Sequence, residues 1–293
     1  MERKVENLDP MNDVLFKYLL GSVERKHITI DFLNAVLNRK GKNAIKQIEF
    51  PNVEMTPHNE FEKFARIDIL AVIDDNERVN IEVQCANHRN MEKRSLYYWA
   101  QVFLHDDALM KSKQYAALKP TIAINVLNYK LLPFDEPYSR YSLRNDNHLQ
   151  HVMTDAIEFY FLEVPKFVKK PFAELNHIEK WLGFFSKKLT LKEKEEMAVN
   201  EPAMQDALSS MNPFVMNDIN YLAYINRQAA ILDYTSDMHG ARVEGRVEGR
   251  AEGKNQILRL IGELSRAKRF DEIAKLDSDE KLVEKLSKEF GIE

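Results

Sequence analysis

Two segments rich in β-branched residues, 64–73 and 78–86, are separated only by the polar residues DDNE. A short polar cluster between two strand-like runs is typical of a tight antiparallel hairpin. Pairing across a hairpin keeps the sum of the paired residue numbers constant, so we expect Asp68 to lie opposite a residue at about Glu82. Side chains at opposed positions share one sheet face and lie roughly 5 Å apart. The hairpin therefore predicts two neighbouring carboxylates.

Helical and strand-like patterns surround this hairpin in a definite order. Apolar spacing predicts helices over 10–20, 28–41 and 91–118 and strands over 45–55, 121–129 and 155–165, in addition to the two hairpin segments. The buried stripe expected in the third helix comprises Leu96, Trp99, Ala100, Phe103 and Leu104. The resulting order is α, α, β, β, β, α, β, β, which places the chain in the α/β class with a mixed sheet.

After residue 170 the strand pattern ends, and helical spacing continues to the end of the chain. Residues 242–254 repeat RVEG, RVEG and RAEG before a lysine. A glycine inside a helix costs about 0.5–1 kcal/mol relative to alanine, so this repeat is either a flexible connector or a self-association helix. We predict a core over 1–170, an all-helical region over 171–238, and over 239–293 the repeat with a helical tail as an assembly element.

Composition and motifs exclude several classes of protein. The single Cys85 cannot form an internal disulfide, and His148 and His151 lie in a polar connector without a third metal ligand. A Gly-rich phosphate loop, a dinucleotide fingerprint and a G-x-S-x-G elbow are all missing from the sequence. No apolar run approaches the ~20 residues of a membrane span, and the first residues do not resemble a signal peptide. We expect a cytoplasmic protein with no membrane contact and no small-molecule cofactor.

The opposed carboxylates are the informative chemical feature. Asp68 and Glu82 would repel each other between apolar neighbours, and a hard divalent cation such as Mg²⁺, or Mn²⁺ in its place, would remove that repulsion. Gln84 projects to the same face as Glu82 and would orient a water or a phosphate oxygen. Two alternatives remain open: both acids are solvent-facing residues of an ordinary sheet, or a register shift of one residue separates them.

A family resemblance accompanies these features. The segments NDVLFKYLLGS, ITIDFLNAVLN, RIDILAVIDDNERVNIEVQ, RSLYYWAQVF, KSKQYAALKPTIAINVLNY and FYFLEVPKF, followed by WLGFF, run in order over about residues 8–185. Together they resemble the Rpn family of recombination-promoting nucleases or putative transposases, within the PD-(D/E)XK nuclease superfamily. The resemblance implies a restriction-endonuclease-like αβββαβ core, which agrees with the order of elements inferred above.

The resemblance also implies roles for individual residues. Asp68 resembles the acidic residue of the first catalytic strand, and Glu82 with Gln84 resembles the ExK pair. Asp13 resembles an acidic residue that many members add from the first helix, although an acid in the first turn of a helix is also favoured by the helix dipole. The sequence departs from the superfamily pattern at Gln84, where most members have lysine. Lysine offers the transition state a positive charge that glutamine lacks.

A local basic patch follows the hairpin. The whole chain carries a formal net charge of -4, whereas residues 86–120 carry six basic and three acidic residues. Arg94, with Lys93 beside it and Tyr98 one helical turn later, would contact a DNA backbone. Lys111 and Lys113 are interpreted as ordinary surface lysines. A nucleic-acid contact in this acidic chain would therefore come from the helix after the hairpin.

These observations predict a Mg²⁺-dependent DNA endonuclease. Asp68 and Glu82, helped by the Val83 carbonyl, would hold the metal, and Gln84 would position the nucleophile. Cleavage of both strands needs two active sites, which favours a homodimer. The alternative is a DNA-binding or scaffold protein that keeps the nuclease fold with little or no cleavage, which Gln84 and the acidic net charge would suit.

Overall fold

The computed structural model describes residues 3–51, 67–74, 77–87, 89–104, 114–115 and 118–292. Contacts within the chain divide it into two compact units, Met1–Ile231 and Leu232–Glu293. The boundaries expected from the sequence after residues 170 and 238 stay predictions. Within the described residues, no helix is both long and apolar enough to cross a membrane.

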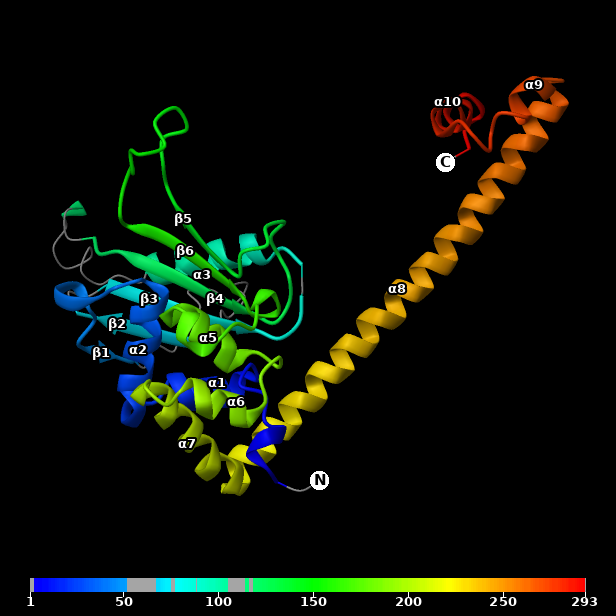
Figure 1. Ribbon diagram of the computed structural model, residues 1–293. Coiled ribbons are helices and arrows are strands. Elements are labelled where there is room, and N and C mark those ends of the chain that lie inside the picture. Colours follow the sequence, from blue (N-terminus) through cyan, green and yellow to red (C-terminus); the bar gives the residue numbers. More distant parts are fainter. Residues whose placement is uncertain are drawn as a thin grey trace. The chain divides into compact units, whose positions relative to one another are not determined.

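A six-stranded mixed sheet forms the centre of the first unit (Figure 1). Its strands are β1 (Ile48–Glu49), β2 (Ile69–Ile73), β3 (Glu77–Gln84), β4 (Thr121–Leu127), β5 (Tyr138–Ser142) and β6 (Ile157–Glu163). The spatial order is β1-β2-β3-β4-β6-β5. The first three strands pair antiparallel, β3, β4 and β6 pair parallel, and β5 pairs antiparallel with β6.

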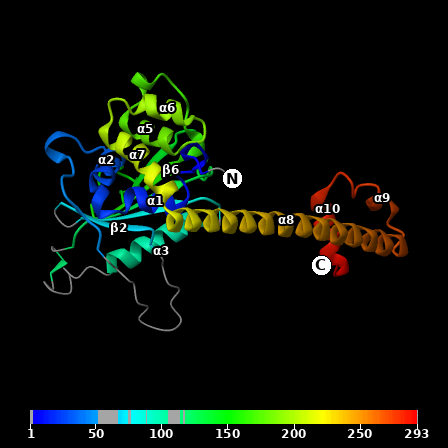
Figure 2. The ribbon, with the colours of Figure 1, turned by 90° about the horizontal axis from the view of Figure 1, so that it is seen from below.

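Helices cover both faces of this sheet. They are α1 (Asp13–Leu20), α2 (Lys26–Val36), α3 (Met91–Leu104), α5 (His177–Phe185), α6 (Leu191–Met197) and α7 (Pro202–Met216). Short 3-10 helices cover Val5–Asn7, Val23–Arg25, Gly41–Asn43, Val164–Lys166 and Phe172–Glu174. Figure 2 shows α3 on one side of the sheet and α1, α2 and α5 to α7 on the other.

The two sheet faces differ in chemistry because side chains alternate along a strand. Val79, Ile81 and Val83 of β3 belong to the main hydrophobic core, which they share with α1, α2, α5 and α7. The intervening residues Glu82 and Gln84 are also buried, but they lie on the face that α3 covers. The structure therefore places the polar residues of β3 between the sheet and α3.

The predicted α/β class with a mixed sheet is confirmed, and the first elements follow the predicted order. Strand β5 was not predicted, because its sequence YSRYS lies at a sheet edge with little burial and therefore has no apolar run. Helix α2 ends at Val36 rather than near Gly41, because Asn38 adopts a left-handed φ of 49°. Of the predicted 45–55 strand, the described residues 45–51 are a strand only at Ile48–Glu49, and 52–55 lie outside the described residues. The hairpin residues Asp75 and Asn76 and much of the predicted continuation of α3 also lie outside them.

The expected buried stripe of α3 is wrong at Leu96 and Leu104, and its other three residues are only half-buried. Leu96 is 50% exposed and Leu104 is 78% exposed, whereas Met91, Ser95 and Val102 are buried. The reason lies in the sheet face beneath the helix, where Asn125 of β4 donates a hydrogen bond to the Ser95 hydroxyl at 2.8 Å. Because this sheet face is polar, the helix residue packed against it is the polar Ser95. The spacing of apolar residues in the sequence does not reveal such a contact.

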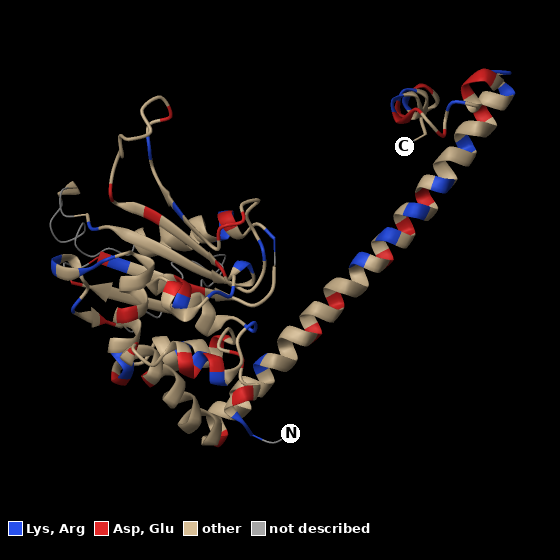
Figure 3. Ribbon diagram, viewed as in Figure 1, with Lys and Arg blue, Asp and Glu red and all other residues tan. Residues whose placement is uncertain are grey.

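Helix α8 (Asp218–Arg266) begins in the first unit and continues into the second. The Gly-containing repeat lies within this helix, and a Cβ added at Gly245, Gly249 or Gly253 would meet nothing within 4 Å. Arginine and glutamate alternate along this part of α8 (Figure 3). The helices α9 (Phe270–Ile273) and α10 (Glu280–Phe290) follow, and the second unit has its own small apolar cluster of Leu260, Leu264, Leu286 and Ile292.

Candidate functional site

The hairpin register brings Asp68 and Glu82 together. Ile69 pairs with Ile81, so one further step along the same register puts Asp68 opposite Glu82. The backbone N–H of Asp68 donates to Oε1 of Glu82 at 3.3 Å. The backbone N–H of Val83 in turn donates to Oδ2 of Asp68 at 3.0 Å. The two carboxylates therefore share the end of the hairpin that is remote from its turn.

The Glu82 carboxylate is almost completely buried, with 1% of the residue exposed. Burial, together with the negative charge of Asp68, raises the pKa of Glu82 to about 8. Arg94 and the hydrogen bond from Asp68 act in the opposite direction but do not outweigh burial. Burial and the neighbouring negative charge thus outweigh the positive charge of Arg94 at Glu82.

Asp68 has a direct cationic partner that the sequence interpretation did not include. Lys17 of α1 places its amine 2.9 Å from Oδ1 of Asp68, and the two side chains are 31% and 12% exposed. Both residues also line a depression of about 310 Å³. Asp68 is therefore the more accessible of the two carboxylates, and its charge is partly compensated from a helix more than fifty positions away in sequence.

Gln84 connects the carboxylates to α3. Its amide nitrogen lies 3.4 Å from Oε2 of Glu82, and its amide oxygen accepts a hydrogen bond from the Arg94 guanidinium at 3.2 Å. Arg94 also donates to the Tyr98 hydroxyl at 3.1 Å and lies over the Tyr98 ring, 5.2 Å from its centroid. The predicted DNA-contacting pair therefore adjoins the predicted catalytic residues.

The remaining predicted site residues are arranged differently. Asp13 pairs with Arg227 of α8 at 2.8 Å, and Lys93 is exposed on α3. Among the described residues, no group of three or more His, Cys, Asp or Glu side chains is placed to hold a metal ion, so the structure does not assemble Asp13 with both hairpin acids. His148 and His151 are exposed, and Lys111 and Lys113 lie outside the described residues.

The donor set around Glu82 is suited to a hard cation. Asn125 of β4 occupies the register position beside Glu82, and Asn80 precedes it on the same strand face. The Oδ1 atoms of both asparagines are buried without a hydrogen-bond donor among the described residues. Carboxylate and amide oxygens are the ligands that Mg²⁺ and Ca²⁺ prefer. The two unpaired amide oxygens and the Glu82 carboxylate are therefore suitable ligands for a divalent cation.

Two neighbours of the hairpin carboxylates, Asn125 and Lys17, were not predicted as site residues, and the sequence contains a weak signal only for Asn125. Asn125 is the one polar residue inside the otherwise apolar run IAINVL, and a lone amide in a buried strand is a reason to look for a polar partner. Lys17 had no such signal, because one lysine on an amphipathic helix is ordinary.

Comparisons with known proteins identify one family. No curated protein and no solved structure matches the chain. A sequence model of the family described as PD-(D/E)XK nuclease family transposase matches residues 10–241, which include the whole sheet and every predicted site residue. The match extends from α1 into α8 and covers well over half of the chain. This chain therefore belongs to the PD-(D/E)XK nuclease family transposases.

Proposed function

We propose that this protein is a divalent-metal-dependent endonuclease that hydrolyses phosphodiester bonds of DNA. Membership of the family indicates a nuclease-like function, and PD-(D/E)XK nucleases typically use divalent metals. The observation that supports the finer proposal is the pairing of Asp68 with the buried Glu82, whose pKa is raised by burial and by the negative charge of Asp68.

Within this proposal, Asp68, Glu82 and the carbonyl of Val83 would hold Mg²⁺ or Mn²⁺. A bound ion of this kind neutralises charge on a phosphate and lowers the pKa of a bound water. Gln84 would orient the attacking water, because its amide is held between Glu82 and Arg94. Lys17 would supply, from α1, the positive charge that the glutamine at position 84 lacks.

Arg94, Tyr98 and Lys93 would bind the DNA backbone. Phosphate contacts from arginine and lysine fix the orientation of a duplex but carry no base preference, so we expect little sequence specificity. The protein would act in the cytoplasm as a homodimer that presents two active sites, associated through the repeat in α8. Complementary Arg and Glu rows along the repeat support such an association.

The test is cleavage of supercoiled plasmid by the purified chain with Mg²⁺ or Mn²⁺. We expect the wild type to nick the plasmid, and Asp68→Ala and Glu82→Ala to lose at least about a hundredfold in rate. Glu195→Ala is the matched control, because Glu195 is an exposed acid on α6 outside the site. Equal rates in all four proteins would remove the hairpin acids from the mechanism.

A second candidate function has one specific observation in its favour. Lys17 already pairs with Asp68, and position 84 carries no charge, so the site is partly neutralised without any metal. A scaffold protein that binds DNA but does not cut it would have such a site, because it needs no metal to neutralise Asp68. In that case no metal would support cleavage, while duplex DNA would still bind and Arg94→Met would weaken that binding.

A further inference from the structure

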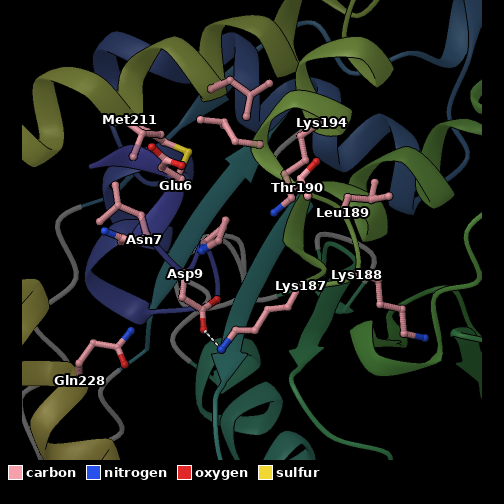
Figure 4. A pocket seen from close by; sticks show the side chains of 15 residues that line it. Glu6, Asn7, Asp9, Lys187, Lys188, Leu189, Thr190, Lys194, Met211 and Gln228 are labelled. Atoms are coloured by element: carbon pink, nitrogen blue, oxygen red, sulfur yellow. Dashed lines mark ion pairs between the residues drawn. The ribbon is translucent and has the colours of Figure 1, made fainter. Parts of the chain in front are cut away.

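A cavity of about 450 Å³ lies in the first unit, away from the hairpin carboxylates. The N-terminal segment, the loop between α5 and α6, and helices α6 and α7 form its walls, as Figure 4 shows. Leu189, Leu208 and Met211 contribute apolar surface, and Asp9, Lys187 and Lys194 contribute charge. The lining thus combines apolar and polar groups in similar measure, and a concave site of this kind offers an organic ion both kinds of contact.

Lys194 is the unusual residue of this cavity. It is only 9% exposed, and its amine lies 6.0 Å from the centroid of the Phe184 ring. No carboxylate among the described residues pairs with that amine. An aromatic ring face attracts a cation only weakly at this distance, so it does not replace a counter-ion.

The other charged groups of the cavity are already satisfied. Lys187 and Asp9 pair at 2.7 Å, and Figure 4 shows these two side chains pointing toward each other. The Lys188 amine extends away from that pair and donates to the carbonyl oxygens of Pro165, at 2.9 Å, and Phe167, at 2.6 Å. Glu6 is exposed to solvent. Lys194 is thus the buried charge of this cavity that has no partner in the described residues.

Burial has the expected effect on this amine. It lowers the pKa of Lys194 to about 8, with the positive charge of Lys187 adding to the effect and Asp9 opposing it. The amine is still mostly protonated at neutral pH. A buried ammonium without a counter-ion is costly, and an anionic ligand that enters the cavity would relieve this cost.

We propose that this cavity binds a small organic monoanion, whose carboxylate would pair with the amine of Lys194 while its apolar body packs on Leu208 and Met211. A single negative charge matches the single unpaired ammonium. Leu208 and Met211 would give a hydrocarbon body an apolar contact that a compact inorganic ion would not make. This site is independent of the hairpin carboxylates, so its test does not depend on nuclease activity.

The experiment compares three probes on the full chain by isothermal titration calorimetry: octanoate, octanamide and inorganic phosphate. Octanamide has the same hydrocarbon body as octanoate but no charge. We expect octanoate to bind at least about tenfold more tightly than either of the others, since a charge-assisted contact is lost in octanamide and the apolar contact is lost in phosphate.

Two variants locate the site. Lys194→Met should reduce octanoate affinity by at least about tenfold. Lys192→Met should leave it unchanged, because Lys192 lies on the same helix with an 85% exposed side chain and does not line the cavity. The proposal is overturned if octanoate and octanamide bind equally to the wild type, if no octanoate binding is detected at millimolar concentration, or if folded Lys194→Met binds octanoate normally. The probe comparison on the wild type decides the question even if Lys194→Met does not fold.

Discussion

The amine of Lys17 lies 2.9 Å from Oδ1 of Asp68, so a helix near the start of the chain neutralises one of the two hairpin carboxylates. The other carboxylate, Glu82, is buried and has no ion-pair partner among the described residues. The two acids therefore differ in character although they lie side by side: Asp68 is ion-paired and the more exposed, and Glu82 is held in buried surroundings that raise its pKa.

Removal of the Lys17 charge should strengthen metal binding. Lys17 competes with any cation for Oδ1 of Asp68, so we expect Lys17→Met to bind Mn²⁺ about tenfold more tightly in a calorimetric titration. Under saturating Mn²⁺ the same variant should cleave plasmid more slowly, because it lacks the positive charge of Lys17 that we propose stabilises the transition state. Lys42→Met, at an exposed position, is the control. An unchanged or weaker Mn²⁺ affinity would contradict competition between lysine and metal.

Glu82→Gln should stabilise the metal-free protein. The wild type carries a desolvated carboxylate beside Asp68, and the amide keeps the shape without the charge. In EDTA at pH 8 we expect the free energy of unfolding, measured with urea, to rise by about 1–3 kcal/mol.

Excess Mg²⁺ should reverse this order, because a metal that binds only the folded wild type adds to its stability alone. Glu195→Gln should match the wild type in both buffers. If Glu82→Gln were less stable than the wild type in EDTA, the Glu82 carboxylate would be a stabilising group and the argument for a missing cation would fail.

Arg94→Met should weaken binding to duplex DNA at every sequence tested. Loss of one phosphate contact reduces the slope of log affinity against log salt by about one, which fluorescence anisotropy over a salt series measures. Tyr98→Phe removes only the hydroxyl that accepts from Arg94 at 3.1 Å, so its effect should be smaller. An unchanged salt slope in Arg94→Met would mean that this guanidinium serves Gln84 and not a phosphate.

Lys194 should make the free energy of unfolding depend on pH in the alkaline range. Its pKa is lowered from 10.5 to about 8 in the folded chain. Between these values the unfolded chain binds more protons, so this residue makes the free energy of unfolding rise as pH increases from about 8 toward 10.5. Lys194→Met should be more stable than the wild type by about 1–3 kcal/mol at pH 7, and the difference should shrink by pH 10.

Urea unfolding at pH 7, 8.5 and 10 measures this change, with Lys192→Met as the control that should follow the wild type at every pH. A difference between Lys194→Met and the wild type that stays constant from pH 7 to pH 10 would show that Lys194 titrates normally.

The repeat in α8 should control self-association. We expect the full chain to sediment as a dimer, and the triple variant Glu244→Lys, Glu248→Lys and Glu252→Lys to sediment as a monomer, because reversal of one charge row makes both rows basic. All three glutamates are exposed, so the variant should fold normally. A wild type that remains monomeric in sedimentation velocity at micromolar concentration would refute assembly through the repeat.

Local patterns in the sequence were sufficient for the features that depend on near neighbours. Asn12 accepts a hydrogen bond from Val14 and begins α1 as its sequence position indicates. The register of the hairpin follows from its short connection, and the alternation of strand side chains then puts Glu82 and Gln84 on one face. The opposition of Asp68 and Glu82 was predictable for this reason.

Features that depend on distant contacts were decided only by the tertiary structure. The sequence does not indicate that Lys17 reaches Asp68, that Asn125 lies beside Glu82, or that Ser95 replaces Leu96 beneath α3. The cavity at Lys194 likewise needs the N-terminal segment and α6, which are separated by more than 180 residues. Local propensity determines helices, strands and short turns, whereas the partner of a buried charge is chosen by packing between elements that no short-range pattern connects.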